Sequence, residues 1–329
     1  MSASVESPLL SVNGLKVHFP RAKKGWFQPA EVVKAVDGVS FDIARGTTLA
    51  VVGESGSGKT TAALAVLRLG PVTEGRIRLG DTELGTLEGE ALRQARRRVK
   101  IFFQDPHSSL NPRERAGAAV RAPLDLMQVG TPAQRTERVT ELFNAVGLRP
   151  EQQHLFPHQF SGGQRQRINI ARALATNPEL VVCDEPVSAL DIAIRAQILN
   201  LLVRLQRELG LTYLFISHDM AVVEHICDDI AVMYLGQIVE RASRRAFFAN
   251  PLHPYSVALM SAVPTVHGGR KHAAQRIKLS GDPPSPINPP AGCRFAGRCP
   301  VAEPACVAEL PPLREVVPGH WVRCRRVNL

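Results

Sequence analysis

One short stretch, from Gly53 to Thr61, constrains the fold of this chain more than any other. It reads Gly-Glu-Ser-Gly-Ser-Gly-Lys-Thr-Thr and has the complete spacing of a P-loop. An apolar run precedes it at residues 48–52, and a helix-compatible run follows from Thr60 to Leu67. Strand, glycine loop and helix form the required context, because converging backbone N–H groups and a helix N-terminus together bind phosphate oxygens. We expect the phosphates of a nucleotide to be bound by Gly53, Glu54, Ser55, Gly56, Ser57, Gly58, Lys59, Thr60 and Thr61, with Lys59 at the β- and γ-phosphates and Thr60 on Mg²⁺.

The bulk composition limits the classes of protein that fit. The chain has 329 residues, 44% of them apolar, which suffices for one large or two medium domains. Its apolar runs all fall short of the roughly 18 residues that span a membrane, and its start lacks the pattern of a secretory signal. The net charge is +10, with the densest cluster between Arg93 and Lys100. No aromatic residues interleave with this cluster, which favours a solvated face or a face towards a membrane partner over nucleic-acid binding. We therefore expect a cytosolic chain, or one held to a membrane by partners.

Strand and helix patterns alternate along most of the chain, which predicts a mainly parallel sheet covered by helices. Between about residues 105 and 177 the strand signal disappears, and helical periodicity replaces it. After about Arg245 prolines crowd together and cysteines appear. We predict a nucleotide-binding domain over residues 1–245, with the helical subdomain 105–177 inserted, and a C-terminal extension over residues 246–329.

Two further stretches carry residues suited to phosphate chemistry. Asp184 and Glu185 follow a buried apolar strand, where a carboxylate for Mg²⁺ and a general base for the attacking water are needed. Ser161-Gly-Gly-Gln164 precedes an apolar-periodic helix, so that Ser161 is a plausible N-cap and the glycines expose backbone N–H groups. This predicts a second anion site at a helix N-terminus.

The order of these motifs resembles the ATP-binding-cassette ATPase family. The resemblance covers about residues 9–245 and implies an α/β P-loop NTPase fold, mainly parallel with antiparallel edge strands, followed by an irregular Cys-containing extension. By resemblance, Gln104 senses Mg²⁺ and the attacking water, and His218 holds the γ-phosphate and orients Glu185. Phe19 takes the place of the aromatic that stacks on adenine. By resemblance, the signature that clamps ATP held by a partner chain comprises Ser161, Gly162, Gly163 and Gln164. The loop of Asp191 closes the contact between subunits.

Other stretches resemble the dipeptide and oligopeptide permease ATPases of the F type (OppF/DppF-like), including residues 103–112, 250–255 and 285–295. The resemblance implies ATP-driven peptide uptake at the cytoplasmic face of the bacterial inner membrane. It implies a second, related ATPase subunit bound head to tail, two transmembrane permease subunits and an extracytoplasmic peptide-binding protein. Importers for nickel, glutathione or another small solute remain an alternative, because other chains select the substrate. A soluble cassette acting on nucleic acid, or an interaction module without ATPase activity, fits less well.

Four of the six cysteines lie near the C-terminus, namely Cys293, Cys299, Cys306 and Cys324. In a cytosolic protein such a group indicates a metal before disulfides. No Cys-x-x-Cys knuckle is present, so the spacing is unlike common zinc modules, yet four thiolates suit either Zn²⁺ or an iron–sulfur cluster. Members of the peptide-permease family can hold a [4Fe–4S] cluster, and we expect one here, with zinc or unligated thiols as the alternatives.

Overall fold

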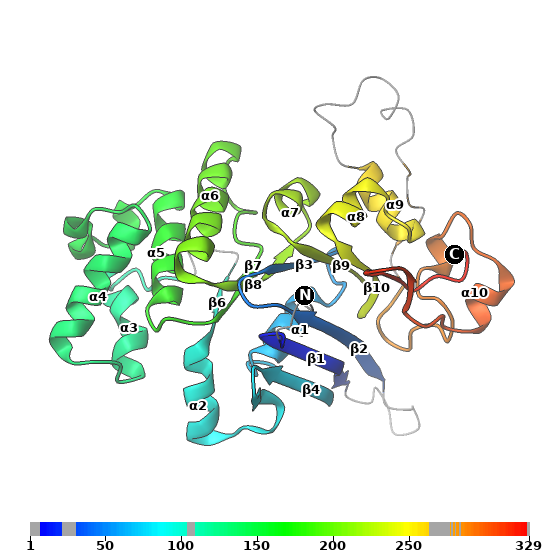
Figure 1. The fold of residues 1–329 in the computed structure, drawn as a ribbon, viewed down its shortest axis with the longest axis horizontal. Helices are drawn as coiled ribbons and strands as arrows, with labels where there is room; N and C mark the ends of the chain where they lie inside the picture. The colour runs from blue at the N-terminus through cyan, green and yellow to red at the C-terminus, as the bar shows by residue number, and fades with distance from the viewer. Residues whose placement is uncertain are drawn as a thin grey trace, which may run out of the picture. The chain divides into compact units, whose positions relative to one another are not determined.

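The computed structural model describes residues 7–21, 31–103, 109–262, 277, 279, 281–282 and 284–327. The chain divides into two compact units. Figure 1 labels the helices and strands from which they are built. The first consists of the described residues of Met1–Leu10, together with Asp42–Thr48 and Arg78–Ser217. The second consists of Ser11–Phe41, Leu49–Ile77 and the described residues of His218–Leu329. Each unit is therefore assembled from stretches that lie far apart in the sequence.

Three parallel strands form the sheet of the first unit, in the order β8 (Thr212–Ser217), β7 (Leu180–Asp184) and β6 (Val99–Phe102). Every residue of β7 and β8 is buried, as expected for mainly apolar strands that are covered on both faces. Their parallel direction requires long connections, which the helices of this unit supply. The first unit also contains β5 (Thr82–Glu83), η1 (Leu84–Thr86), α2 (Gly89–Arg98) and α6 (Ile192–Leu209).

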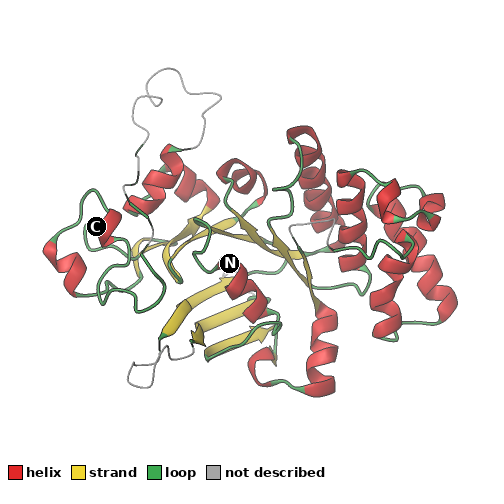
Figure 2. Cartoon of the chain, turned by 180° about the vertical axis from the view of Figure 1, so that it is seen from behind, coloured by secondary structure: helices red, strands yellow, loops and turns green. Residues whose placement is uncertain are grey.

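The predicted helical insertion is a group of three helices, α3 (Ala116–Leu126), α4 (Pro132–Ala145) and α5 (Gly162–Leu174). The three pack against one another, and Figure 2 shows helices and loops without strands in this part of the chain. Two short 3₁₀ helices, η2 (Pro150–His154) and η3 (Pro157–Gln159), connect α4 to α5. Buried side chains such as Val120, Leu142 and Phe143 form the core of the group.

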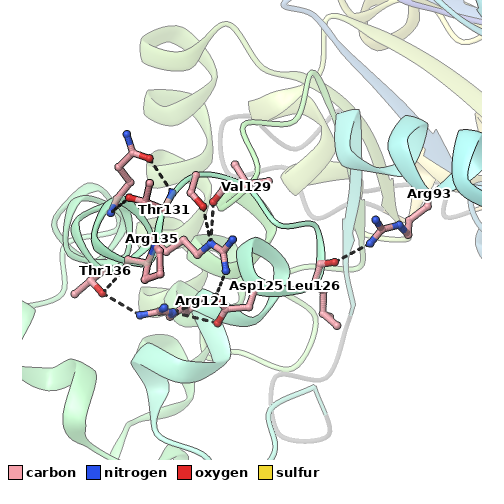
Figure 3. Close-up of polar contacts among 11 residues, drawn as sticks. Arg93, Arg121, Asp125, Leu126, Val129, Thr131, Arg135 and Thr136 are labelled. Carbon is pink, nitrogen blue, oxygen red and sulfur yellow. Dashed lines mark hydrogen bonds and ion pairs between the residues drawn. The ribbon is translucent and has the colours of Figure 1, made fainter.

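The turn between α3 and α4 is held by charged side chains (Figure 3). Asp125 accepts hydrogen bonds from Arg121 of its own helix, at 3.1 Å, and from Arg135 of α4, at 2.8 Å. The Nε of Arg135 also donates to the backbone carbonyl of Val129 at 3.0 Å, within the turn itself. The Arg135 and Arg121 guanidinium groups lower the pKa of Asp125. Arg93 of α2 donates to the carbonyl of residue 126 at 2.7 Å, which ties α2 to the end of α3.

The second unit contains both sheets that flank the predicted P-loop. In one, β3 (Thr48–Val52) runs parallel to β9 (Asp229–Tyr234), and antiparallel strands follow in the order β10 (Gln237–Ser243), β12 (His320–Val322) and β11 (Arg314–Val317). In the other, the order is β2 (Val32–Ile43), β1 (Leu10–Pro20) and β4 (Glu74–Leu79). The predicted mixture of parallel and antiparallel edge strands is confirmed. The helices of this unit are α1 (Lys59–Val66), α7 (Met220–Ile226), α8 (Arg244–Ala249), α9 (Pro254–Ser261), η4 (Ala296–Arg298) and α10 (Pro304–Ala308).

The C-terminal extension shares a core with the P-loop strand. Val52 of β3 and Tyr234 of β9 belong to the same buried cluster as Tyr255 and Phe295 of the extension. The extension is therefore more ordered than its proline content indicates, since β11 and β12 also add two short strands to the sheet. The sequence pattern gives little sign of these strands, because they are only four and three residues long.

A buried carboxylate fixes the extension to β10. Glu240 is fully buried and accepts hydrogen bonds from the backbone N–H groups of Leu252, at 2.8 Å, and His253, at 2.7 Å. The Nε2 of His320 lies 2.7 Å from the same carboxylate. Burial lowers the pKa of His253 to about 4, so its imidazole is neutral near pH 7 and Nδ1 accepts from the N–H of Tyr255. Among the described residues, none of the helices combines the length and apolar character needed to cross a bilayer.

Candidate functional site

The P-loop has the conformation that its glycines predict. Gly53 and Gly58 have φ angles of 154° and 101°. A Cβ on Gly53 would lie 2.1 Å from the carbonyl oxygen of Met233, and one on Gly58 would lie 2.2 Å from that of Ala35. Only glycine fits such close approaches of backbone to backbone. The loop therefore wraps tightly around the start of α1, where the N–H groups of a helix N-terminus attract anions.

Lys59 lies at the first position of α1, and its side chain is buried. Its ammonium group donates to the carbonyls of Gly53, at 2.8 Å, and Glu54, at 2.9 Å. The lysine is thus held over the concave side of its own loop, as a phosphate-binding lysine should be. Thr60, the second residue of α1, is exposed.

The two carboxylates after β7 occupy different environments. Asp184 is buried at the end of the strand, whereas Glu185 begins the following loop. Glu185 has a φ of 47°, a left-handed conformation that is rare for a residue with a side chain. Its N–H donates to the carbonyl of Ile216 at 3.0 Å, and its carbonyl accepts from the hydroxyl of Ser188 at 3.0 Å. Strained backbone of this kind is concentrated at functional sites.

Ser161 caps α5 as predicted. Its hydroxyl accepts from the N–H of Gln164 at 3.3 Å, and the Gln164 side chain accepts from the N–H of Ser161 at 2.9 Å. This reciprocal capping box fixes the helix start. The two glycines between them, Gly162 and Gly163, are the first residues of the helix, and a Cβ on Gly163 would meet Ile194 at 2.5 Å. Asp191 caps α6 by accepting from the N–H of Ile194 at 2.9 Å.

The capped start of α5 opens onto a cavity of about 530 Å³ in the first unit. Ser161, Gly163 and Gln164 line it. The cavity also contains Arg149 and Arg167, which the sequence analysis did not single out. Two arginines beside backbone N–H groups make this cavity suited to phosphate groups. A signal was available in the sequence, since Arg167 follows the Ser-Gly-Gly-Gln stretch on the same helix.

The remaining predicted residues of the ATP site lie in the second unit or outside the described residues. Phe19 lies near the end of β1 with a side chain that is 39% exposed, available for a ring contact. His218 is exposed directly after β8, and Asp219 beside it caps α7 by accepting from the N–H of Ala221 at 3.0 Å. Gln104 and the basic insert around Trp26 lie outside the described residues.

The four C-terminal cysteines line a single cavity, together with Phe295 and His253. All four are free thiols. The N–H of Cys293 donates to the carbonyl of Cys306 at 2.7 Å, which brings two of the segments together. Burial raises the pKa of Cys293 and of Cys299, and the neighbouring thiols act in the same direction.

The cysteines fit a bound metal group in kind, because four thiolates around one cavity are the donor set of zinc and of [4Fe–4S] centres. Over the described ranges, however, no three His, Cys, Asp or Glu side chains stand in an arrangement that could hold a metal ion. The four cysteines therefore line the same cavity, but their side chains are not arranged as the ligands of one metal ion.

Comparisons with known proteins show which families this chain is similar to. Residues 36–188 match the ABC transporter family, and residues 239–306 match the family described as "Oligopeptide/dipeptide transporter, C-terminal region". The chain is 47% identical to the oligopeptide transport ATP-binding protein AppF of Bacillus subtilis (strain 168), over 98% of this chain and 99% of that protein. It is 46% identical to the dipeptide transport ATP-binding protein DppF of Escherichia coli (strain K12), over 99% of this chain and 96% of that protein.

Solved structures of cassettes share the fold. A dimeric ATP-binding cassette in a post-hydrolysis state, bound to ADP and phosphate, matches with a TM-score of 0.62 and 29% identity, covering 72% of this chain and 99% of that one. The cbiO1 protein of Clostridium perfringens, part of an ABC transporter complex, matches with a TM-score of 0.64 and 26% identity, covering 74% of this chain and 92% of that one. With relatives this similar over almost its whole length, the chain belongs to the ATP-binding-cassette family of transporter ATPases, with the C-terminal region of the oligopeptide/dipeptide transporters.

Proposed function

We propose that this protein is the ATP-hydrolysing subunit of an importer for oligopeptides or dipeptides. The observation that carries this proposal is the near full-length similarity to ATP-binding proteins of peptide transporters, which includes the C-terminal region. This region favours peptide import over nucleic-acid binding, and over the importers of nickel, glutathione or other small solutes that we considered from the sequence.

In the proposed ATP site, Lys59 binds the β- and γ-phosphates, and Phe19 stacks on adenine. Thr60, Gln104 and Asp184 would hold Mg²⁺, which would supply positive charge for the phosphate oxygens. Glu185 accepts a proton from the water that attacks the γ-phosphorus, and ADP leaves with the bridging oxygen. His218 orients Glu185 and contacts the γ-phosphate.

The second half of the site belongs to a different chain. Each chain has one P-loop and one Ser-Gly-Gly-Gln stretch, and a related cassette has been solved as a dimer bound to ADP and phosphate. We infer that two ATPase subunits pair head to tail, so that Ser161–Gln164 of one chain clamps the γ-phosphate held by the other. Asp191 lies in the loop that closes this contact. The cavity lined by Arg149 and Arg167 supports the assignment, because it offers positive charge next to the signature.

Two transmembrane permease subunits and an extracytoplasmic peptide-binding protein complete the proposed transporter. The ATPase subunit is peripheral and lies on the cytoplasmic face of the inner membrane. We propose that the helical subdomain, about residues 105–177, transmits the motion of the cassette to the permease. Residues 1–245 form the nucleotide-binding domain in this proposal, and residues 246–329 the extension.

Reconstitution of the complete complex tests the transport function. The complex is placed in lipid vesicles with Mg²⁺·ATP inside and the binding protein outside. We expect uptake of a labelled di- or oligopeptide with the wild-type subunit and none with Glu185→Gln, which should still bind ATP. Uptake of nickel or glutathione in place of peptide would contradict the proposal.

We further propose that Cys293, Cys299, Cys306 and Cys324 hold a [4Fe–4S] cluster, with zinc as the alternative. Such a group would cross-link segments of the extension through these cysteines. Anaerobically purified protein should contain about four iron and four sulfide per chain. Cys299→Ser should lose this iron, whereas Cys227→Ala, a buried cysteine remote from the cavity in sequence, should keep it. Zinc in place of iron would establish the alternative, and protein without either metal would contradict both.

A further inference from the structure

The second residue of the P-loop, Glu54, is held from three directions. Its carboxylate accepts two hydrogen bonds from Arg298, at 2.8 and 3.2 Å. Its backbone N–H donates to the hydroxyl of Tyr255 at 2.8 Å. Its carbonyl accepts from the ammonium group of Lys59 at 2.9 Å. A shift of Glu54 would therefore also move the lysine that meets the phosphates.

Arg298 is well placed to fix this residue. Its side chain is only 9% exposed, so its bidentate pair with Glu54 is less screened than a surface pair. The hydrogen bonds to Glu54 raise the pKa of Arg298, which keeps its charge in place. Its backbone N–H donates to the carbonyl of Phe295 at 2.9 Å, and Phe295 packs edge-on against Tyr234, with ring centroids 5.3 Å apart. The backbone of Arg298 is thus fixed to a buried aromatic residue, which limits the positions that its guanidinium group can take.

A second arginine of the same loop supports the P-loop by another route. Arg294, next to Cys293, has a buried side chain that pairs with Asp37 and donates to the carbonyl of Leu235. The next residue, Gly236, donates its N–H to the carbonyl of Ser57 in the P-loop at 2.8 Å. The loop between Cys293 and Cys299 therefore contacts the P-loop directly at Glu54. It also contacts Ser57 indirectly, through the backbone of residues 235 and 236.

These contacts exceed what attachment of the extension requires. The extension is already fixed by the Glu240 hydrogen bonds and by the shared aromatic core. A pair that only fastened the extension could engage any surface carboxylate, whereas Arg298 engages the carboxylate inside the phosphate loop. Without Arg298, Glu54 would place an uncompensated negative charge in the loop that receives the phosphates.

We propose that the loop from Cys293 to Cys299 braces the P-loop, and that Arg298 is a positioning residue for ATP binding that acts through Glu54. The inference rests on the proposed role of Gly53–Thr61 as the phosphate-binding loop. It gives the extension a part in nucleotide binding, which the sequence analysis did not assign to it. Because Arg298 lies between two of the four cysteines, the packing of their cavity is linked to the affinity for ATP.

A double-mutant cycle on the full-length protein tests the proposal, with the dissociation constant of Mg²⁺·ATP as the readout. Arg298→Met keeps an apolar side chain and removes the charge, and we expect it to weaken binding about 10-fold, within the roughly 5- to 150-fold range of coupling between sites. Glu54→Gln breaks the same ion pair from the other side and should weaken binding by a similar factor. In the Glu54→Gln background, Arg298→Met should then have almost no effect. Arg298→Lys should restore part of the affinity.

The controls separate positioning from folding. Arg245→Ala removes an exposed arginine from the same unit and should leave binding unchanged. Urea unfolding of each variant shows whether the extension is still folded. Equal effects of Arg298→Met in both backgrounds, or unchanged binding by Arg298→Met, would overturn the proposal. Lys59→Ala tests the P-loop assignment separately from the role of Arg298. Normal ATP binding by that variant would overturn the P-loop assignment itself.

Discussion

The left-handed backbone at Glu185 gives a prediction with a definite sign. A residue with a side chain pays roughly 1–2 kcal/mol in this conformation, and its φ here is 47°. Glycine escapes that cost but loses about 0.5–1 kcal/mol of additional chain entropy on folding. Glu185→Gly should therefore be more stable than Glu185→Ala, by about 0.75 kcal/mol at the midpoints of these two ranges.

At a position inside a helix, the alanine variant should instead be more stable than the glycine variant. Glu137 is an exposed residue within α4, where alanine should be more stable than glycine by about 1 kcal/mol. Urea unfolding followed by circular dichroism measures both differences in nucleotide-free protein. The free energy of unfolding of the glycine variant minus that of the alanine variant should be negative at position 137 and positive at position 185.

Activity is measured on the same variants. Glu185→Gly, Glu185→Ala and Glu185→Gln should each lose ATP turnover and retain ATP binding, because none of them can accept the proton of the attacking water. Alanine more stable than glycine at position 185 would refute the argument from strain. Wild-type turnover in any of the three variants would refute the catalytic role.

Three further predictions concern other positions. Lys59→Ala removes the ammonium group of the P-loop and should weaken Mg²⁺·ATP binding at least about 10-fold in calorimetric titration, since charged hydrogen bonds to phosphate are lost; unchanged affinity would count against the assignment. Gly58→Ala should abolish ATP binding, because its Cβ would lie 2.2 Å from the carbonyl of Ala35, and normal binding would show that the loop can relax. Glu240→Gln should cost about 1–3 kcal/mol in urea unfolding, because an amide NH₂ would replace one of the two oxygens that accept the buried N–H groups of Leu252 and His253; an unchanged free energy of unfolding would contradict that role.

The sequence analysis predicted the local structure of those proposed site segments that consist of consecutive residues. Gly53–Thr61, Ser161–Gln164 and the end of β7 each combine a short motif with its flanking elements, and hydrogen bonds within a few residues fix their local geometry. The capping box at Ser161 is one example, since both of its hydrogen bonds join residues only three positions apart.

Contacts between distant segments could not be predicted in the same way. Glu54 and Arg298 are 244 residues apart, and Glu240 and His320 are 80 residues apart. Each pair forms only because the extension returns to the P-loop strand and β10, which no local pattern encodes. The left-handed conformation of Glu185 was equally hidden, since glutamate has no preference for it.

A structure of the assembled transporter carrying Glu185→Gln, determined with Mg²⁺·ATP by electron microscopy, tests the central claim most directly. We expect each ATP between two cassettes, with its γ-phosphate contacted by Lys59 of this subunit and the Ser-Gly-Gly-Gln stretch of its partner, or by Ser161 of this subunit and the lysine of its partner. ATP enclosed within a single cassette, away from any Ser-Gly-Gly-Gln stretch, would contradict the account.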